Sequence, residues 1–309
     1  MLTEQTEIAH TSHKILEQLG QVISGRDDTL LWMLVAVLAK GHILLEDMPG
    51  VGKTTLALAF SQVLGLSCRR MQFTPDVMPS DITGYTRYHP ITGAMEYQPG
   101  PVLCNLFLAD ELNRANTRTQ AALLEAMQEG QVTVDGISHR LPSPFSVIAT
   151  QNPVGAAGTQ PLPDSQLDRF SVRLTLGYPL PKDELAMLLT EKPVLSPLLE
   201  PGQLEDLQQL AAATYLGDAA GAYLIRLIRA TRRHSQILRG ASPRATVSLA
   251  AMARVLARLR GRDFVIPADI RDAYVPAIAH RIQPASQTAG ADVEILTRIR
   301  NAIPLPEPY

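Results

Sequence analysis

The stretch Asp47-Met48-Pro49-Gly50-Val51-Gly52-Lys53-Thr54 decides the fold of this chain. It nearly matches the pattern G-x-x-x-x-G-K-[ST], with Asp47 in place of the first glycine. The apolar run His42–Glu46 comes before it, and residues Thr54–Leu64 have helical spacing. The stretch is therefore predicted to join a buried strand to a helix, which is the beginning of a βα unit.

The residues of this loop suit phosphate groups. Gly50 and Gly52 let the backbone turn so that several N–H groups point at phosphate oxygens, and the following helix adds the positive end of its dipole. Lys53 can reach the β- and γ-phosphates of a nucleotide, and the hydroxyl of Thr54 can ligate Mg²⁺. The carboxylate of Asp47 is expected to face away from the phosphates. The alternative interpretation is a glycine-rich turn with a surface lysine. The predicted contacts to ATP are Pro49, Gly50, Val51, Gly52, Lys53, Thr54 and Thr55.

Strands and helices alternate after this loop. A helix is predicted at Thr117–Glu129, and alternation of this kind predicts a parallel sheet covered on both faces. The further apolar strands are Leu106–Ala109, Phe145–Thr150 and Val172–Leu176. Two inserts with strand-like alternation interrupt the order, at Asp81–Tyr97 and at Gln131–Leu141, where Asp135-Gly136 indicates a hairpin.

Two carboxylates, Asp110 and Glu111, come directly after the strand Leu106–Ala109. Ligands of open α/β sheets bind at the carboxyl ends of the strands, so both side chains are expected beside the phosphate loop. Asp110 would hold Mg²⁺, and Glu111 would orient or deprotonate the attacking water. A helix cap or a solvated turn is the alternative for such a pair taken alone. Together with the phosphate loop, the pair favours hydrolysis.

Three further side chains have two interpretations each. Asn152 follows a predicted strand, where its amide could touch the γ-phosphate or position water, but Asn-Pro is also a common turn. Arg169 precedes a strand and Arg244 begins a helix, and either guanidinium could stabilise developing phosphate charge. A surface salt bridge is the alternative for a lone arginine.

The character of the chain changes near Pro179-Leu180-Pro181, and after this point the pattern is helical. Pro243 and Pro267 fit the first turns of helices. We therefore predict an α/β nucleotide-binding core over residues 1–180 and a smaller all-helical domain over residues 181–309. The candidate helices are Lys182–Thr190, Leu204–Ala213, Ala219–His234, Arg244–Arg260 and Ala268–Ile278.

Composition narrows the class of protein. Hydrophobic residues make up 46% of the 309 residues, which is enough for a large core, and the net charge of −2 lacks the basic footprint of a nucleic-acid binder. The longest apolar run, Leu30–Ala39, is shorter than the roughly 20 residues that span a bilayer. The first residues show no basic-then-apolar signal pattern. We expect a cytoplasmic protein with no membrane span.

These residues together resemble the MoxR family of AAA+ ATPases, in family order and over most of residues 20–250. The stretch around Phe73–Gly84 is not a general feature of nucleotide-binding proteins. The matching stretches are Leu45–Thr54, Gln72–Gly84, Ala109–Ala115, Gln120–Met127, Gln131–Gly136, Ala149–Pro153, Leu162–Phe170 and Ala241–Ala245.

The resemblance implies roles that the residues alone leave open. Asn152 would be the sensor-1 residue, Arg169 the arginine finger that reaches a neighbouring subunit's ATP, and Arg244 the sensor-2 residue that contacts γ-phosphate from the lid. Val22, Ile23 and Gly25 lie in the segment that would pack on adenine. The inserts would face the substrate of a ring, most often a hexamer. Similar proteins act as chaperone-like motors that mature protein complexes, often by metal or cofactor insertion, and are frequently paired with a von Willebrand factor A domain protein.

Three functions compete. The first is an ATP-driven ATPase that remodels a client protein complex. The second is an ATP-dependent nucleic-acid motor on the same scaffold, which the low basicity disfavours. The third is a nucleotide-gated scaffold with little turnover, which the presence of Glu111 disfavours.

Overall fold

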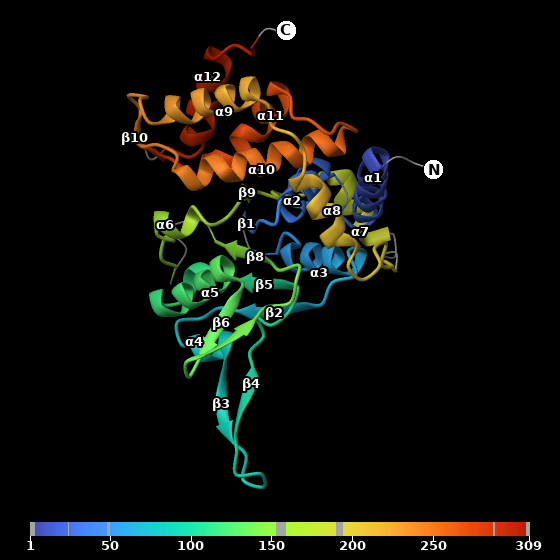
Figure 1. The fold of residues 1–309 in the computed structure, drawn as a ribbon, viewed down its shortest axis with the longest axis vertical. Coiled ribbons are helices and arrows are strands. Elements are labelled where there is room, and N and C mark those ends of the chain that lie inside the picture. Colours follow the sequence, from blue (N-terminus) through green and yellow to red (C-terminus); the bar gives the residue numbers. More distant parts are fainter. Residues whose placement is uncertain are drawn as a thin grey trace.

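The computed structural model describes residues 4–23, 25–47, 50–152, 159–189, 194–286 and 288–306. A five-stranded parallel sheet in the order β2-β5-β8-β1-β9 forms its central layer (Figure 1). The predicted strands are present, and the carboxyl ends of neighbours are in register, since Glu46 pairs with Gln151 and Gln72 with Asp110. The strands are β1 (Ile43–Glu46), β2 (Cys68–Gln72), β5 (Leu106–Asp110), β8 (Ser146–Gln151) and β9 (Val172–Leu174).

The two faces of the sheet belong to two separate hydrophobic clusters. Side chains alternate along each strand, so that Leu108 and Ile148 join one cluster while Phe107 and Val147 join the other. The first cluster includes α1 (Glu4–Val22), α2 (Asp27–Leu38) and α3 (Lys53–Val63). The second includes α4 (Pro79–Thr83) and α5 (Thr117–Glu129). The doubly covered parallel sheet predicted from sequence is thus confirmed.

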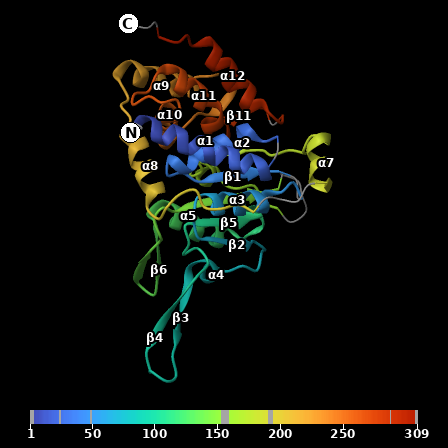
Figure 2. The same cartoon turned by 90° about the vertical axis from the view of Figure 1, so that its right-hand side faces the viewer.

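Both inserts are hairpins. The first consists of β3 (Gly84–Tyr88) and β4 (Met95–Pro99), and it projects far from the body of the molecule (Figure 2). The second consists of β6 (Gln131–Val134) and β7 (Ile137–Arg140), as Asp135-Gly136 indicated. The ring of Tyr97 stacks on that of His139 with centroids 3.7 Å apart, which joins the two hairpins near their bases.

Helices dominate the C-terminal part, as expected, and both Pro243 and Pro267 lie in first turns. The structure adds a short antiparallel pair of β10 (Ile237–Arg239) with β11 (Gln283–Pro284), and the helix α12 (Ala291–Ala302). The remaining elements are α6 (Asp164–Leu167), α7 (Pro181–Leu189), α8 (Gln203–Ala212), α9 (Asp218–Thr231), α10 (Pro243–Leu259), α11 (Pro267–Ile278), and the 3₁₀ turns η1 (Leu112–Arg114) and η2 (Ala279–Arg281).

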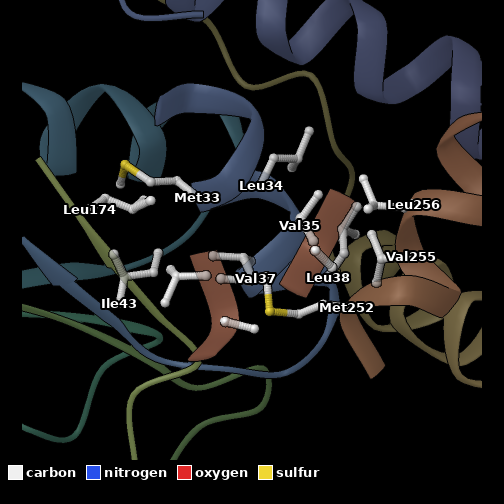
Figure 3. Packing of buried hydrophobic residues seen from close by; sticks show 14 of the residues in the cluster. Met33, Leu34, Val35, Val37, Leu38, Ile43, Leu174, Met252, Val255 and Leu256 are labelled. Carbon is white, nitrogen blue, oxygen red and sulfur yellow. The ribbon is translucent and has the colours of Figure 1, made fainter. Parts of the chain in front are cut away.

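The helix α2 lies between the sheet and the C-terminal helices. Its residues are apolar almost all round, and Met33 points toward Leu174 while Leu38 lies beside Met252 of α10 (Figure 3). One hydrophobic cluster therefore runs without a break from the sheet into α8–α12. The domain boundary at residue 180 stays a prediction. Among the described residues, no helix combines the length and apolar character that crossing a bilayer requires.

Candidate functional site

The phosphate loop leads directly into α3. Gly50 has φ +88° and Gly52, the N-cap of the helix, has φ +94°, a left-handed backbone that favours glycine. A side-chain carbon at either position would meet nothing within 4 Å, so these glycines are needed for their backbone conformation. The first turn of α3 begins at Lys53 and leaves its N–H groups free for an anion. The predicted contact Pro49 lies outside the described residues.

Asp47 takes a structural role at the base of this loop. Its Oδ2 accepts hydrogen bonds from the backbone N–H groups of Leu176 and of Gly177, the second at 2.9 Å. The carboxylate thus points away from the loop, as expected, and ties the loop to the chain that follows β9. The backbone oxygen of Asp47 accepts from Nζ of Lys53 at 2.9 Å. Burial lowers the pKa of Lys53, and the nearby carboxylates of Asp110, Asp47 and Glu111 oppose this effect.

Two cavities meet at the loop. The first has a volume of about 250 Å³ and mostly apolar walls, with Val22, Ile23 and Val51 among them. The second has about 350 Å³ and polar walls, which include Lys53, Thr54, Asp110, Glu111 and Asn152. The two cavities share Gly50, Gly52 and Thr55 in their walls. An apolar compartment joined to a polar one along a phosphate-type loop has the shape and chemistry to hold a nucleotide.

Gly25 is not in the wall of the apolar cavity. It has φ +70°, and a side-chain carbon there would lie 2.5 Å from Oδ2 of Asp183 on α7. Gly25 therefore contributes to this segment through its backbone and its lack of a side chain, whereas Val22 and Ile23 line the apolar cavity.

Asp110 ends β5 and is held by two partners. Oδ1 accepts from the hydroxyl of Thr150 at 2.6 Å, and Oδ2 accepts from Nε of Arg70 at 3.2 Å and from its Nη2 at 2.7 Å. The same Thr150 hydroxyl accepts from the backbone N–H of Glu111 at 2.8 Å. The strand end of β8 thus orients both acidic residues.

Glu111 has left-handed backbone geometry, with φ +57°. Arg114 donates to its Oε2 at 2.8 Å, and Nδ2 of Asn152 donates to its Oε1 at 3.3 Å. The bond from Arg114 is the main cause that lowers the pKa of Glu111, and burial opposes it. The hydrogen bond from Arg114 therefore favours the ionised carboxylate.

Asn152 directly follows the carboxyl end of β8, the central strand of the sheet. Asn113 fixes its backbone, since Oδ1 of Asn113 accepts from the N–H of Asn152 at 3.3 Å and its Nδ2 donates to the carbonyl at 3.1 Å. Oδ1 of Asn152 is buried and has no hydrogen-bond partner among the residues that the structure describes, which resume at residue 159. It is a spare acceptor beside the carboxylate of Glu111, where a water molecule would find two acceptors.

Arg169 and Arg244 lie together elsewhere, at the joint between core and lid. Nη1 of Arg169 donates to the carbonyl of Leu124 on α5, and Nη2 of Arg244 donates to Oε1 of Gln128 on the same helix at 3.2 Å. The positive charge of Arg244 also lowers the pKa of Arg169, after the larger effect of burial. Neither arginine lines the polar cavity of its own chain. In Figure 1 the β10 end of the lid lies on the side of α5 and α6, whereas α3 lies on the other.

Comparisons with known proteins identify the family of this chain. The model of the ATPase family associated with various cellular activities (AAA) matches residues 42–172, and that of the AAA lid domain matches residues 229–299. Chaperone MoxR1 of Mycobacterium tuberculosis is 37% identical over 96% of this chain and 83% of its own. The uncharacterized protein YeaC of Bacillus subtilis is 42% identical over 95% of this chain and 94% of its own. The chain belongs to the MoxR family of AAA+ ATPases.

A crystal structure of a candidate ATPase from Cytophaga hutchinsonii supports the fold of this MoxR-family chain. It superposes with a TM-score of 0.88 at 32% identity, and the match covers 98% of this chain and 97% of that one. The AAA+ core with a helical lid, predicted from sequence, is thus confirmed.

The residues of this MoxR-family site fit ATP and Mg²⁺. Lys53 and the N–H groups of α3 suit phosphate oxygens, and the apolar cavity beside Val22 and Ile23 suits a base. The hydroxyl of Thr54 and the carboxylate of Asp110 are oxygen donors of the kind that Mg²⁺ prefers, and both line the polar cavity.

Sequence reasoning missed several residues that shape the site. Thr150 and Asn113 occur in stretches that resemble the family, yet nothing in their spacing assigned them a task. Arg114 had a signal in the sequence, because it follows Glu111 by three residues. Arg70 had none, because its strand was not predicted.

Proposed function

We propose that this chain binds ATP with Mg²⁺ between α3 and the ends of β5 and β8, and hydrolyses it. The observation that carries the proposal is the polar cavity that brings together Lys53, Thr54, Asp110, Glu111 and Asn152 beside an apolar cavity. No feature of a general glycine-rich turn requires such a set of side chains.

The side chains divide the work. Lys53 would leave the Asp47 carbonyl, which it contacts at 2.9 Å, and donate to the β- and γ-phosphates. Thr54 and Asp110 would hold Mg²⁺, which when bound neutralises the charge of the phosphates. Glu111, kept ionised by Arg114, would accept a proton from the attacking water, and the spare Oδ1 of Asn152 would orient that water.

The two arginines would act on the nucleotide of a neighbouring subunit. Arg169 and Arg244 share one face of the chain at the core–lid joint, and the polar cavity of the same chain does not include them. The expected contact of Arg244 with γ-phosphate would accordingly be made in trans, beside Arg169. A site completed in trans needs an assembly, and we propose a homo-oligomeric ring, most simply a hexamer.

The first test separates binding from hydrolysis. Lys53→Ala should abolish binding of a fluorescent ATP analogue, while Lys14→Ala on the exposed face of α1 should not. Glu111→Gln should keep nucleotide affinity and lower turnover by about a hundredfold or more, since a positioned base contributes roughly that much. Glu96→Gln on the β3–β4 hairpin is the matched control. Normal affinity in Lys53→Ala, or normal turnover in Glu111→Gln, would refute the assignment.

The second test concerns the arginines. Arg169→Ala and Arg244→Ala should each bind ATP normally and lose turnover in the assembly. Mixing either variant with Lys53→Ala subunits should restore part of the activity, because some interfaces then combine an intact loop with intact arginines. If neither arginine variant regained activity with Lys53→Ala subunits at any mixing ratio, the arginines would act within their own chain.

We further propose that hydrolysis drives remodelling of a client protein complex in the cytoplasm, with metal or cofactor insertion as one outcome, together with a von Willebrand factor A domain partner. The relative named Chaperone MoxR1 supports the chaperone part of this proposal. The β3–β4 hairpin is suited to client contact, since Ile91 at its tip is 89% exposed and Tyr88 and Met95 are exposed as well. Co-purification with a tagged chain, with and without ATP, tests for the partner, and recovery of no such domain protein under either condition would refute it.

A further inference from the structure

Arg70 occupies the polar cavity from a strand that has no assigned part in the site. It stands on β2, the edge strand next to β5, in register with Leu108 two residues before Asp110. Its guanidinium reaches along the strand end and places Nε and Nη2 on one carboxylate oxygen, Oδ2 of Asp110, at 3.2 Å and 2.7 Å. Nη2 also donates to Oε1 of Gln72 at 3.0 Å.

Arg70 covers the oxygen of Asp110 that has more capacity for a metal ion. Oδ1 already accepts the short bond from Thr150, which leaves it one lone pair, whereas Oδ2 has no other partner than Arg70 among the described residues and would offer two. Arg70 lines the same polar cavity as Lys53 and Thr54. A guanidinium and a divalent cation on one carboxylate oxygen compete for the same lone pairs and repel each other.

The geometry of the ion pair between Arg70 and Asp110 allows a metal ion to replace the arginine. The side chain of Arg70 is 48% exposed, whereas that of Asp110 is 11% exposed, so the arginine can move into solvent while the carboxylate stays fixed by Thr150. Moving an exposed guanidinium out of such a pair costs little free energy, because water solvates the guanidinium. A divalent ion held also by Thr54 and phosphate oxygens would make several bonds at once.

From this geometry we infer that Arg70 is a displaceable counter-ion of the metal site. It neutralises Oδ2 of Asp110 when the cavity holds no metal, and Mg²⁺ that enters with ATP displaces it. The inference rests on the proposed function, and it assigns Arg70 a positioning role: the residue sets how tightly the site takes the metal.

Metal affinity measured directly tests this inference. Mn²⁺ has the same preference for oxygen ligands as Mg²⁺ and is visible by electron paramagnetic resonance. Free and bound Mn²⁺ are measured in the presence of a saturating, non-hydrolysable ATP analogue. Arg70→Ala and Arg70→Gln should bind Mn²⁺ about two- to fivefold more tightly than the unmodified protein, the range expected for loss of a half-exposed ion pair. Arg69→Ala, on the neighbouring position of β2, should match the unmodified protein.

The two substitutions guard against a folding artefact, because glutamine is shorter than arginine and uncharged but keeps a polar N–H donor, whereas alanine removes the side chain altogether. Unchanged or weaker Mn²⁺ affinity in both variants would overturn this inference alone. Absence of nucleotide-dependent Mn²⁺ binding in the unmodified protein would overturn the proposed function, and the inference with it.

Discussion

Thr150 shows how one hydroxyl organises the carboxyl end of the sheet, where the proposed site lies. It donates to Oδ1 of Asp110 at 2.6 Å and accepts from the N–H of Glu111 at 2.8 Å, so it fixes a side chain and a backbone group of two adjacent residues. The side chain is fully buried. A buried hydroxyl with two such partners positions the acidic residues and does not alter the charge of the site, because both carboxylates would still be present if the hydroxyl were removed.

Thr150→Val should therefore impair turnover more than binding. Valine has the shape of threonine but leaves the N–H of Glu111 and Oδ1 of Asp110 without this partner, at a cost of about 1–3 kcal/mol. We expect an ATPase rate about tenfold lower, with the affinity for an ATP analogue preserved. Steady-state kinetics and equilibrium binding measure the two quantities. Thr133→Val, at an exposed hydroxyl of β6, is the control, and equal rates in both variants would exclude the positioning role.

His42 predicts how stability depends on pH. Its Nδ1 accepts from the N–H of Val147 and its Nε2 donates to the carbonyl of Met127, each at 3.1 Å, so the folded chain holds it neutral. Burial lowers its pKa from 6.5 to about 4, and the bond to Met127 opposes this. The unfolded chain binds the proton more tightly, so this contribution is complete above pH 6.5 and is lost as the pH falls toward 4.

The full loss from His42 is about 3 kcal/mol. His42→Gln keeps one donor and one acceptor but does not titrate, so it should flatten the fall in the free energy of unfolding over this pH range. Denaturant unfolding at several pH values measures it. An equally steep fall in the glutamine variant would assign the acid sensitivity to other groups, such as His280, whose pKa burial also lowers.

At the residue scale, sequence predicted the groups whose chemistry defines the site and missed those that orient them. Lys53, Asp110 and Glu111 occur in patterns that follow from strand ends and glycine-rich turns. Arg70 and Thr150 reach the site only because β2 and β8 flank β5, and strand order is set by tertiary packing.

Among the elements, α2 and α10 connect the sheet to the lid through direct packing. Met252 of α10 is fully buried and lies beside Leu38 of α2 (Figure 3). Met252→Ala should lower the free energy of unfolding by about 2–5 kcal/mol. The substitution leaves a cavity between α10 and α2, and two packed helices can relax only partly to fill it. Val247→Ala, on the same helix but 70% exposed, should change it by about 0.5 kcal/mol or less.

Thermal and denaturant unfolding of both variants give the comparison. Similar losses at Met252 and Val247 would mean that α10 does not depend on its contact with α2.

Element prediction succeeded where one periodicity dominated. The buried strands and the helix α5 were predicted because they are apolar runs or amphipathic patterns. The strand β2, Cys68–Gln72, was missed because it carries two exposed arginines and is extended only through its pairing with β5. The pair β10–β11 is too short to show alternation.

For the whole molecule, the contact between core and lid beside Arg169 and Arg244 determines how these two arginines are placed. Asp168 accepts from the hydroxyl of Ser242 at 3.0 Å and 2.8 Å, one contact to each carboxylate oxygen, and it lies 3.7 Å from Nε of Arg281. Asp168 neighbours Arg169, and Ser242 caps the helix on which Arg244 stands. The sequence predicted that both arginines lie near strand or helix ends. It did not predict that they are neighbours, because this depends on how the lid packs against the core.

Asp168→Ala should therefore act on stability and assembly together. Arg281 is buried and would lose its carboxylate partner, and burial already lowers the pKa of Arg281 to about 10 against the opposing effect of Asp168. The free energy of unfolding should fall by about 2–4 kcal/mol, somewhat less than for a fully buried pair because Asp168 is partly exposed. ATP affinity of the monomer should be preserved, while turnover of the assembly falls because Arg169 and Arg244 are no longer held side by side.

Ser242→Ala separates the two effects, because it removes the link to the lid helix but leaves Asp168 beside Arg281. It should lower turnover in the assembly with a loss of stability of only about 1 kcal/mol, the typical cost of a helix N-cap. If Asp168→Ala lost stability while both variants kept full turnover, the joint would serve the fold alone. The two arginines would then have to be positioned by their contacts to α5, through Leu124 and Gln128.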